Sequence, residues 1–153
     1  MSGTKFVYVT YIRTSVEKVW KGLTDPTYTR QYWCETWQEC IWKNGAPWRI
    51  MAPNGRVADS GQIRNIEPLR KISLTWQNHL FPEMNAEGHS LLTYEMEAMG
   101  DTVKLTLTHE IDKPDSKLIA GTSSGWPMIL SSLKSLLETG QPLEATRRWP
   151  KDM

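Results

Sequence analysis

The chain has 153 residues, enough for one domain, with 18 Lys and Arg against 17 Asp and Glu and a formal net charge of +1. Because the charge is balanced, the chain offers no broad field for steering nucleic acid or an anionic membrane surface. No apolar run approaches the ~20 residues of a membrane span, and the N-terminus lacks the apolar core of a signal peptide.

The first part of the chain predicts a strand followed by two short helices. Residues 6–12 form the predicted strand. Residues 14–17, Thr-Ser-Val-Glu, have the form of a capping box, and apolar residues then recur at helical spacing as far as Leu23. Asp25 with Pro26 suits the start of a second helix that reaches about Trp33.

From residue 35 the pattern changes to the period of two that strands show. Strands are predicted over residues 35–42 and 48–52, with turn dipeptides of the Asn-Gly type at 44–45 and 54–55. Further strands are predicted over residues 57–66, 71–77, 92–97 and 103–110. In the last three, apolar and polar residues alternate, which is typical of antiparallel strands covered on one side.

The last helix is predicted over residues 125–139, where apolar residues form a single stripe. Its members are Trp126, Ile129, Leu130, Leu133, Leu136 and Leu137. Ser123 or Ser124 suits its N-cap and Pro127 suits its first turn. Gly140 suits the left-handed residue that follows a helix.

The remaining segments are predicted as loops and a tail. Residues 78–88 are long for a hairpin connection and carry three large apolar side chains, which suits a lid. Residues 112–122 form the predicted loop before the last helix. Residues 141–153 show no periodicity and are predicted to be a loosely held tail.

The order of these elements is one strand, two short helices, six strands and one long helix. It predicts an α+β fold, in which a curved antiparallel sheet of about seven strands grips the C-terminal helix. We expect one domain over residues 1–153, with its core at about 6–140. A curled sheet around a helix is expected to leave a hollow at one end.

The cysteines and the sequence motifs limit the chemistry. Cys34 and Cys40 lie six residues apart in one predicted strand region, roughly 20 Å apart, which is too far for a disulfide. Their spacing matches no zinc site, so two free thiols in a reducing cytoplasm are expected. No nucleophile elbow, phosphate-binding loop, HExxH motif or metal-ligand cluster occurs. The sequence therefore predicts no metal and no cofactor.

Four segments of the chain resemble a known family. Residues 19–26, VWKGLTDP, are similar to its first-helix motif, and residues 61–76 to its central hairpin. Residues 93–109 are similar to its last hairpin, and residues 125–140 to its closing helix. Over about residues 6–140 the chain thus resembles the START-like helix-grip (SRPBCC) superfamily. The branch it resembles is named after the C-terminal domain of the activator of the heat-shock-protein-ninety ATPase.

The resemblance implies a deep apolar cavity between sheet and long helix, used in the superfamily for lipids, polyketides, hormones and antibiotics. The chain has eight Trp and five Tyr but two Phe. Large rings with a polar end suit the walls of a ligand site as well as an ordinary aromatic core. The candidate cavity-lining residues are Trp48, Trp76, Tyr94, Met96, Leu107, His109, Trp126 and Leu130.

Two polar residues leave alternatives open. His109 shares the dry face of its strand with Leu105 and Leu107, so burial should lower its pKa. It serves either as a polar anchor or acid–base group in the cavity, or as a structural histidine at the sheet margin. Asp59 either faces inward, where it has to be paired or functional, or belongs to a polar sheet edge.

Three functions follow from these residues and from the resemblance. The first, which we favour, is the non-catalytic or weakly catalytic binding of a hydrophobic or aromatic small molecule. The second, implied by the resemblance, is a co-chaperone-like module that stimulates a chaperone ATPase. The third is a cyclase- or hydrolase-like enzyme that uses His109 with a carboxylate. The expected partner is therefore a hydrophobic small molecule, with a second copy of the chain or a chaperone as further candidates.

Overall fold

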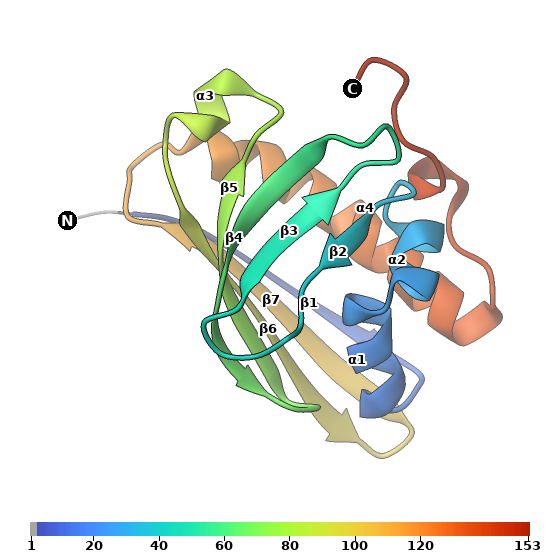
Figure 1. Ribbon diagram of the computed structural model, residues 1–153. Helices are drawn as coiled ribbons and strands as arrows, with labels where there is room; N and C mark the ends of the chain where they lie inside the picture. Colours follow the sequence, from blue (N-terminus) through green and yellow to red (C-terminus); the bar gives the residue numbers. More distant parts are fainter. Residues whose placement is uncertain (1–2) are drawn as a thin grey trace.

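The computed structural model describes residues 3–153, which form one curved antiparallel sheet of seven strands. The strands are Thr4–Ile12 (β1), Trp37–Glu39 (β2), Pro47–Met51 (β3), Val57–Glu67 (β4), Lys71–Asn78 (β5), Ser90–Met99 (β6) and Thr102–Ile111 (β7). They lie in the order β1-β7-β6-β5-β4-β3-β2 (Figure 1). From β2 onward each strand pairs with the next one in the chain, and β1 joins the far edge beside β7.

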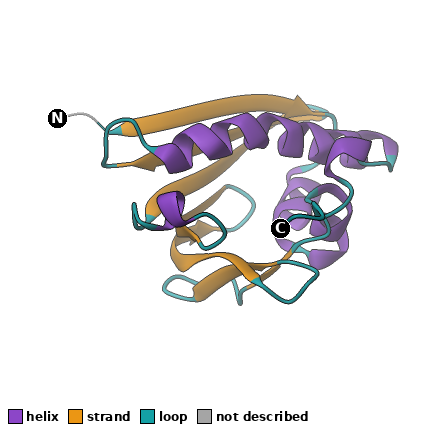
Figure 2. Cartoon of the chain, turned by 90° about the horizontal axis from the view of Figure 1, so that it is seen from above, coloured by secondary structure: helices purple, strands orange, loops and turns teal. Residues whose placement is uncertain are grey.

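Helices cover the concave side of this sheet. Within residues 3–153 they are Val16–Thr24 (α1), Pro26–Tyr32 (α2), Pro82–Asn85 (α3) and Lys117–Thr139 (α4), with a 3-10 turn at Glu144–Thr146 (η1). The long helix α4 runs beside β1, and α1 and α2 close the open side (Figure 2). The predicted α+β helix-grip fold is confirmed. None of the described helices is both long and apolar enough to cross a membrane.

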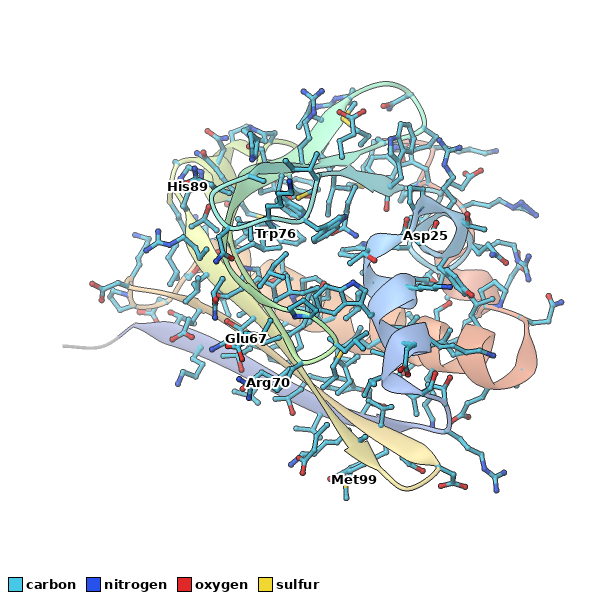
Figure 3. The ribbon with its side chains drawn as sticks, turned by 60° about the horizontal axis from the view of Figure 1, so that its bottom comes forward. Asp25, Glu67, Arg70, Trp76, His89 and Met99 are labelled. Atoms are coloured by element: carbon cyan, nitrogen blue, oxygen red, sulfur yellow. The ribbon has the colours of Figure 1, made fainter. Side chains whose placement is uncertain are left out.

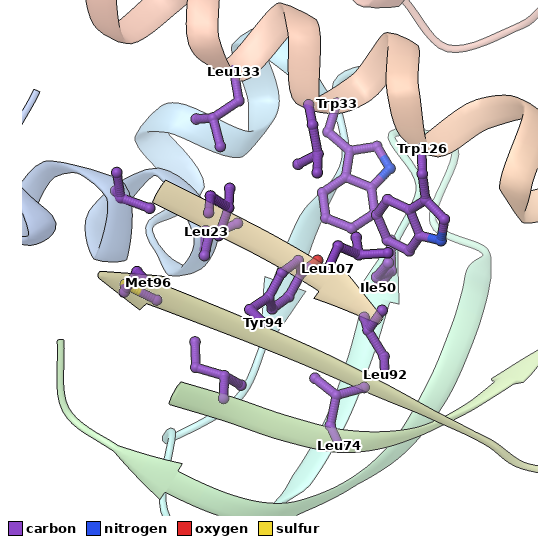
Figure 4. Close-up of a cluster of buried hydrophobic side chains, with 14 of the residues drawn as sticks. Leu23, Trp33, Ile50, Leu74, Leu92, Tyr94, Met96, Leu107, Trp126 and Leu133 are labelled. Atoms are coloured by element: carbon purple, nitrogen blue, oxygen red, sulfur yellow. The ribbon is translucent and has the colours of Figure 1, made fainter. Parts of the chain in front are cut away.

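Along β6 and β7 the side chains point alternately inward and outward, and those that point inward form much of the core. Leu107 on β7 lies opposite Tyr94 on β6, and Met96 follows on the same inward face. Figure 4 shows these side chains below Leu133 of α4. All four are buried. Burial of one such large apolar side chain contributes about 1.5–3 kcal/mol, so this inward face holds α4 against the sheet.

Polar side chains fix the starts of α1 and α2, and the N-cap of α1 is Ser15, one residue later than the predicted capping box at 14–17 implies. The Ser15 hydroxyl accepts a hydrogen bond from the backbone N–H of Lys18 at 3.3 Å. The Asp25 carboxylate accepts one from the backbone N–H of Thr27 at 2.9 Å. Asp25 both ends α1 and caps α2, so the chain turns sharply there and brings α2 against the edge of the sheet.

Helix α4 begins well before the predicted start, because distant side chains cap it. Its N-cap is Ser116, whose hydroxyl accepts a hydrogen bond from the backbone N–H of Ile119 at 3.1 Å. The carboxylate of Glu87, in the connection between α3 and β6, accepts hydrogen bonds from the Ser116 hydroxyl and the Lys117 N–H. These bonds satisfy N–H groups at the helix start that otherwise lack partners.

The local sequence does not predict this first part of α4. The hydroxyls of Ser123 and Ser124 donate back to the carbonyls of Ala120 and Gly121, so neither residue is an N-cap. Pro127 lies inside the helix and not in its first turn. Gly, Ser and Pro all have low helix propensity, so tertiary packing stabilises a helix here that propensity does not favour.

Two other segments differ from the prediction. The strand predicted over residues 35–42 is confined to the three residues of β2. Cys34, Glu35 and Trp42 have φ angles of 53°, 63° and 53°, in the left-handed region that cannot continue a strand. The long connection at 78–88 contains the short helix α3.

Candidate functional site

A cavity of about 200 Å³ lies between the concave face of the sheet and α4. Residues of β3, β4 and β5 line one side, and residues of α4 line another. The segment after α2, the connection after β5 and the C-terminal tail complete the wall. Segments far apart in the sequence therefore meet at this single place.

Three tryptophans form one wall of the cavity. Trp33, which ends α2, meets Trp126 of α4 edge-on, with 5.4 Å between the ring centres. Trp76 of β5 lies 6.4 Å from Trp33 and 5.5 Å from Trp126. Figure 4 shows Trp33 and Trp126 side by side below α4, and Figure 3 shows Trp76 inside the curved sheet. Aromatic pairs at these distances add about 0.5–1.5 kcal/mol each, which favours a rigid wall.

Asp59 is the charged side chain of this wall, and it is only 6% exposed. Asn78, its partner residue on β5, donates from Nδ2 to Asp59 Oδ1 at 3.0 Å. Burial raises the pKa of the Asp59 carboxyl to about 7, and hydrogen bonding from Asn78 opposes this rise only in part. The Trp76 indole N–H also opposes it, although this buried N–H makes no hydrogen bond of normal geometry.

The direction of Asp59 depends on where the sheet is irregular. From the sequence this direction stays open, because a bulge near Gly61 would turn the side chain outward. In the structure the pairing register shifts on β4 at Ala58, directly before Asp59, and again at Arg64. Because of the first shift, Ala58 and Asp59 are both buried, and both line the cavity. Asp59 is a site residue that was not among the eight candidates.

Asn78 is itself fixed by the chain that follows it. Its Oδ1 accepts hydrogen bonds from the backbone N–H groups of Leu80 and Phe81, at 3.0 and 2.9 Å. The amide NH₂ group is therefore directed at Asp59. This arrangement couples the position of the carboxyl group to the connection between β5 and α3.

The C-terminal tail packs over the cavity, although the sequence predicts that it is loosely held. The backbone N–H of Cys34 donates to the Thr146 carbonyl at 2.7 Å. The backbone N–H of Trp149 donates to the Glu35 carboxylate at 3.0 Å. Trp149 and Met153 also line the cavity. Isolated apolar residues without periodicity carry no sequence signal for such docking.

The structure divides the eight candidate residues into two groups. Trp76 and Trp126 line the cavity. The other six are buried in the surrounding core: Trp48, Tyr94, Met96, Leu107, His109 and Leu130. Trp48 packs against Trp76, with ring centres 5.0 Å apart, and so supports the wall from behind. Trp33 and Trp149 are not among the eight candidates, because Trp33 ends a helix too short to show an apolar stripe and Trp149 stands in a tail without periodicity.

Hydrogen bonds hold His109 inside the core. Trp126 Nε1 donates to His109 Nδ1 at 3.1 Å, so the ring proton is on Nε2 and is donated to the Ser90 hydroxyl at 2.7 Å. Ser90 donates in turn to the Trp76 carbonyl at 3.1 Å. Burial lowers the pKa of His109 to about 3, and the ring is neutral at physiological pH. These contacts connect α4 with three strands and favour the structural interpretation.

We expect His109→Phe to lower the free energy of unfolding by about 2–4 kcal/mol, because buried polar groups of Trp126 and Ser90 lose their partner. The affinity for an aromatic ligand should not change, because the His109 ring does not line the cavity. Thermal melting paired with ligand titration checks both expectations. His89→Phe, at an exposed histidine before β6, is the matched control. Weaker binding with unchanged stability would contradict the structural role.

Few titratable side chains line the cavity. Within residues 3–153 they are Asp59 and Cys34. Burial raises the pKa of the Cys34 thiol, so the neutral thiol is favoured over a thiolate nucleophile. Both cysteines are free, and no three His, Cys, Asp or Glu side chains in the described part of the chain lie close enough together to hold a metal ion.

The fold and the cavity define this chain as a helix-grip protein whose cavity lies between a curved sheet and the long C-terminal helix. The chain belongs to the AHSA1 family, described as "Activator of Hsp90 ATPase homolog 1-like protein", which it matches over residues 13–138. The resemblance inferred from the four sequence segments is therefore confirmed. No curated protein matches the chain.

Solved structures from several organisms are similar to this chain. Protein MLL2253 from Mesorhizobium loti is 24% identical, with a TM-score of 0.74 over 88% of this chain and 96% of that one. The Aha1 dimer from Colwellia psychrerythraea is 20% identical, with a TM-score of 0.69 over 90% and 98%. PFC0360w, an HSP90 activator from Plasmodium falciparum, is 19% identical, with a TM-score of 0.71 over 88% and 96%. At these identities the similarity shows the fold alone.

Proposed function

We propose that this protein binds a small aromatic molecule in the cavity between the sheet and α4, without converting it chemically. The observation that supports this most is the make-up of the cavity wall. Aromatic rings from α4, β5, the end of α2 and the tail surround one buried carboxyl group, that of Asp59. Apolar walls with a few directed polar groups are typical of small-molecule sites.

The volume of the cavity limits the size of the ligand. An apolar cavity of about 150 Å³ holds benzene, so a somewhat larger one accommodates one aromatic ring with a short side chain. The cavity has about 200 Å³. Burial of one ring contributes about 4–6 kcal/mol before the costs of association, which corresponds to weak binding unless a polar anchor adds to it.

Acid–base catalysis has less support in this cavity. A general acid and base have to lie within hydrogen-bond reach of a common point. His109 has both ring nitrogens bonded inside the core and does not line the cavity. The pKa of Asp59, about 7, would suit a general acid or base, but among residues 3–153 the other titratable side chain in the cavity is Cys34, whose thiol burial keeps neutral. Binding is therefore better supported than a cyclase- or hydrolase-like reaction.

We expect Gly125→Leu to weaken the binding of a one-ring probe such as 2-phenylethanol at least about tenfold, by filling the cavity. Gly125 lines the cavity from α4, and a Cβ atom there meets nothing within 4 Å. The substitution also replaces a poor helix former, so the fold should be retained or gain up to about 1 kcal/mol. Tryptophan fluorescence titration and calorimetry measure the affinity.

Ser124→Leu is the matched control, because the neighbouring Ser124 is exposed on the same helix and does not line the cavity. It should leave the affinity unchanged. Equal binding by Gly125→Leu and by the wild type would place the ligand elsewhere on the molecule. Absence of any saturable signal with a panel of one-ring aromatics would contradict the proposed function.

A chaperone partner, a homodimer and a cytoplasmic location stay predictions. The family description and PFC0360w concern Hsp90 activation, and the Colwellia psychrerythraea protein is a dimer. Light scattering on the purified protein tests the dimer. Titration with a purified Hsp90 tests the chaperone partner, and Gly125→Leu should leave such surface binding unchanged.

A further inference from the structure

We infer that the ligand is an organic cation, namely a protonated amine on a short chain attached to one aromatic ring. The amine would lie against Asp59, and the ring between the tryptophans of the cavity wall. This inference rests on the proposed function and names its ligand class. Three observations carry it: the unfilled hydrogen-bonding capacity of Asp59, the lack of a positive charge near it, and the aromatic surroundings.

Asp59 has room for a further hydrogen-bond donor. Within residues 3–153 its carboxylate has one hydrogen bond of normal geometry, from Asn78 to Oδ1. A carboxylate accepts up to about four hydrogen bonds through its two oxygens. Because Asn78 is fixed by Leu80 and Phe81, the carboxyl group is held in place although most of its acceptor sites are free. Asp59 lines the cavity, so a ligand there can fill these sites.

The carboxylate also lacks a counter-charge. Among residues 3–153, no Lys, Arg or His side chain lines the cavity. Moving an isolated carboxylate out of water costs several kcal/mol, and a nearby positive charge offsets much of that cost. A neutral donor supplies a hydrogen bond without the charge. A cationic ligand supplies both a hydrogen bond and a positive charge. The negative charge of the Asp59 carboxylate disfavours anionic ligands.

The aromatic walls suit a cation with a ring attached. The faces of aromatic rings carry negative partial charge and attract ammonium groups, most strongly in the case of Trp. Trp33, Trp76 and Trp126 lie within 5.4–6.4 Å of one another, centre to centre, and Trp149 lines the same cavity. One end of the ligand therefore meets the carboxylate while its ring packs among indoles.

The affinity for an amine should depend on pH, because Asp59 has to lose its proton before it meets a cation. Burial raises the pKa of Asp59 to about 7, and no charged neighbour contributes to this shift. Titratable or charged residues on the adjoining segments include Cys34, which lines the cavity, Arg56 directly before β4 and His79 directly after β5. An alkylamine stays protonated to about pH 9, so its affinity should rise about tenfold from pH 6 to pH 8 as Asp59 ionises.

The test compares three ligands of one ring by calorimetry at pH 8: 2-phenylethylamine, 2-phenylethanol and 3-phenylpropionate. The wild type should bind the amine at least about tenfold more tightly than the alcohol, and the anion most weakly. In Asp59→Asn the affinities for amine and alcohol should come within about threefold of each other, since the charge is gone and the shape remains.

Asp112→Asn, which removes an exposed carboxylate after β7, is the matched control and should leave all three affinities unchanged. Equal binding of amine and alcohol by the wild type overturns the cation assignment and leaves the proposed function standing. If Asp59→Asn still binds the amine more tightly than the alcohol, the cation assignment is likewise overturned and the proposed function stands. Failure of the folded wild type to bind any of the three ligands overturns both.

Discussion

Asp59→Asn is expected to be more stable than the wild type above pH 7, by about 4 kcal/mol in the free energy of unfolding. Burial raises the pKa of this carboxyl from 3.8 to about 7 in the folded protein. Asn has the same shape and stays neutral, and its side-chain oxygen still accepts the hydrogen bond from Asn78. The substitution therefore removes the cost of a buried negative charge.

The sign of the pH dependence follows from the direction of the shift. A carboxyl group with a raised pKa favours the folded state while it is protonated, so its contribution is complete below about pH 4 and is lost as the pH rises through about 7. The difference between variant and wild type should be near zero at pH 3–4 and reach its full size near pH 8. Both proteins contain the same other titratable groups, His109 among them, so the contributions of those groups to the pH dependence cancel in the difference.

Urea unfolding of both proteins at several pH values between 4 and 8 measures this difference. Asp112→Asn is again the control, because its exposed carboxyl should give a wild-type curve. If Asp59→Asn and the wild type show parallel curves over this range, Asp59 titrates normally and is open to water. That result would also remove one support of the cation assignment.

The sheet could be predicted because its signals are local. Apolar and polar residues alternate over residues 92–97 of β6 and 103–108 of β7, and the hairpin between these strands turns at Gly100. The Ser15 and Asp25 caps also act within three residues of themselves. Such patterns determine an element together with the face that it buries.

The start of α4 could not be predicted, because the contacts that fix it are distant. Glu87 reaches Lys117 across 30 residues of chain. The helical residues that follow include Gly121, Gly125 and Pro127, which read as a loop by propensity. Packing of the helix onto the sheet outweighs these preferences, and no window of the local sequence contains that information.

The site could be predicted only in part, because local patterns place some of its residues and distant contacts place the others. Trp76 and Trp126 were candidates because strand parity and the helical stripe direct them inward. The direction of the Asp59 side chain does not follow from strand parity, since it depends on which residues are bulged. Trp33 enters the cavity from the end of the short helix α2 and Trp149 from the tail, so only the assembled fold brings them there. The wall is thus a tertiary feature more than a sequence motif.

Gly61→Ala is expected to destabilise the protein by about 3 kcal/mol or more, because β4 and β5 cannot both keep their places around an added methyl group. A Cβ atom on Gly61 would lie 1.8 Å from the Thr75 carbonyl oxygen and 2.5 Å from its carbon. These are backbone atoms, so no side-chain rotation relieves the clash. The strands have to separate at the place where Thr75 accepts a hydrogen bond from the Gln62 N–H.

The same separation should also affect the cavity, because Asp59 and Trp76 lie on these two strands next to the clash. A loss of 3 kcal/mol corresponds to a fall in melting temperature of about 6–12 °C for a domain of this size. Gly125→Ala is the matched control, since the same methyl group meets nothing there and should stabilise α4 by about 0.5–1 kcal/mol. Thermal melting of the two variants and of the wild type measures these changes in stability. A Gly61→Ala protein that melts with the wild type and binds a one-ring aromatic equally well would mean that β4 and β5 are not packed as closely as the structure places them.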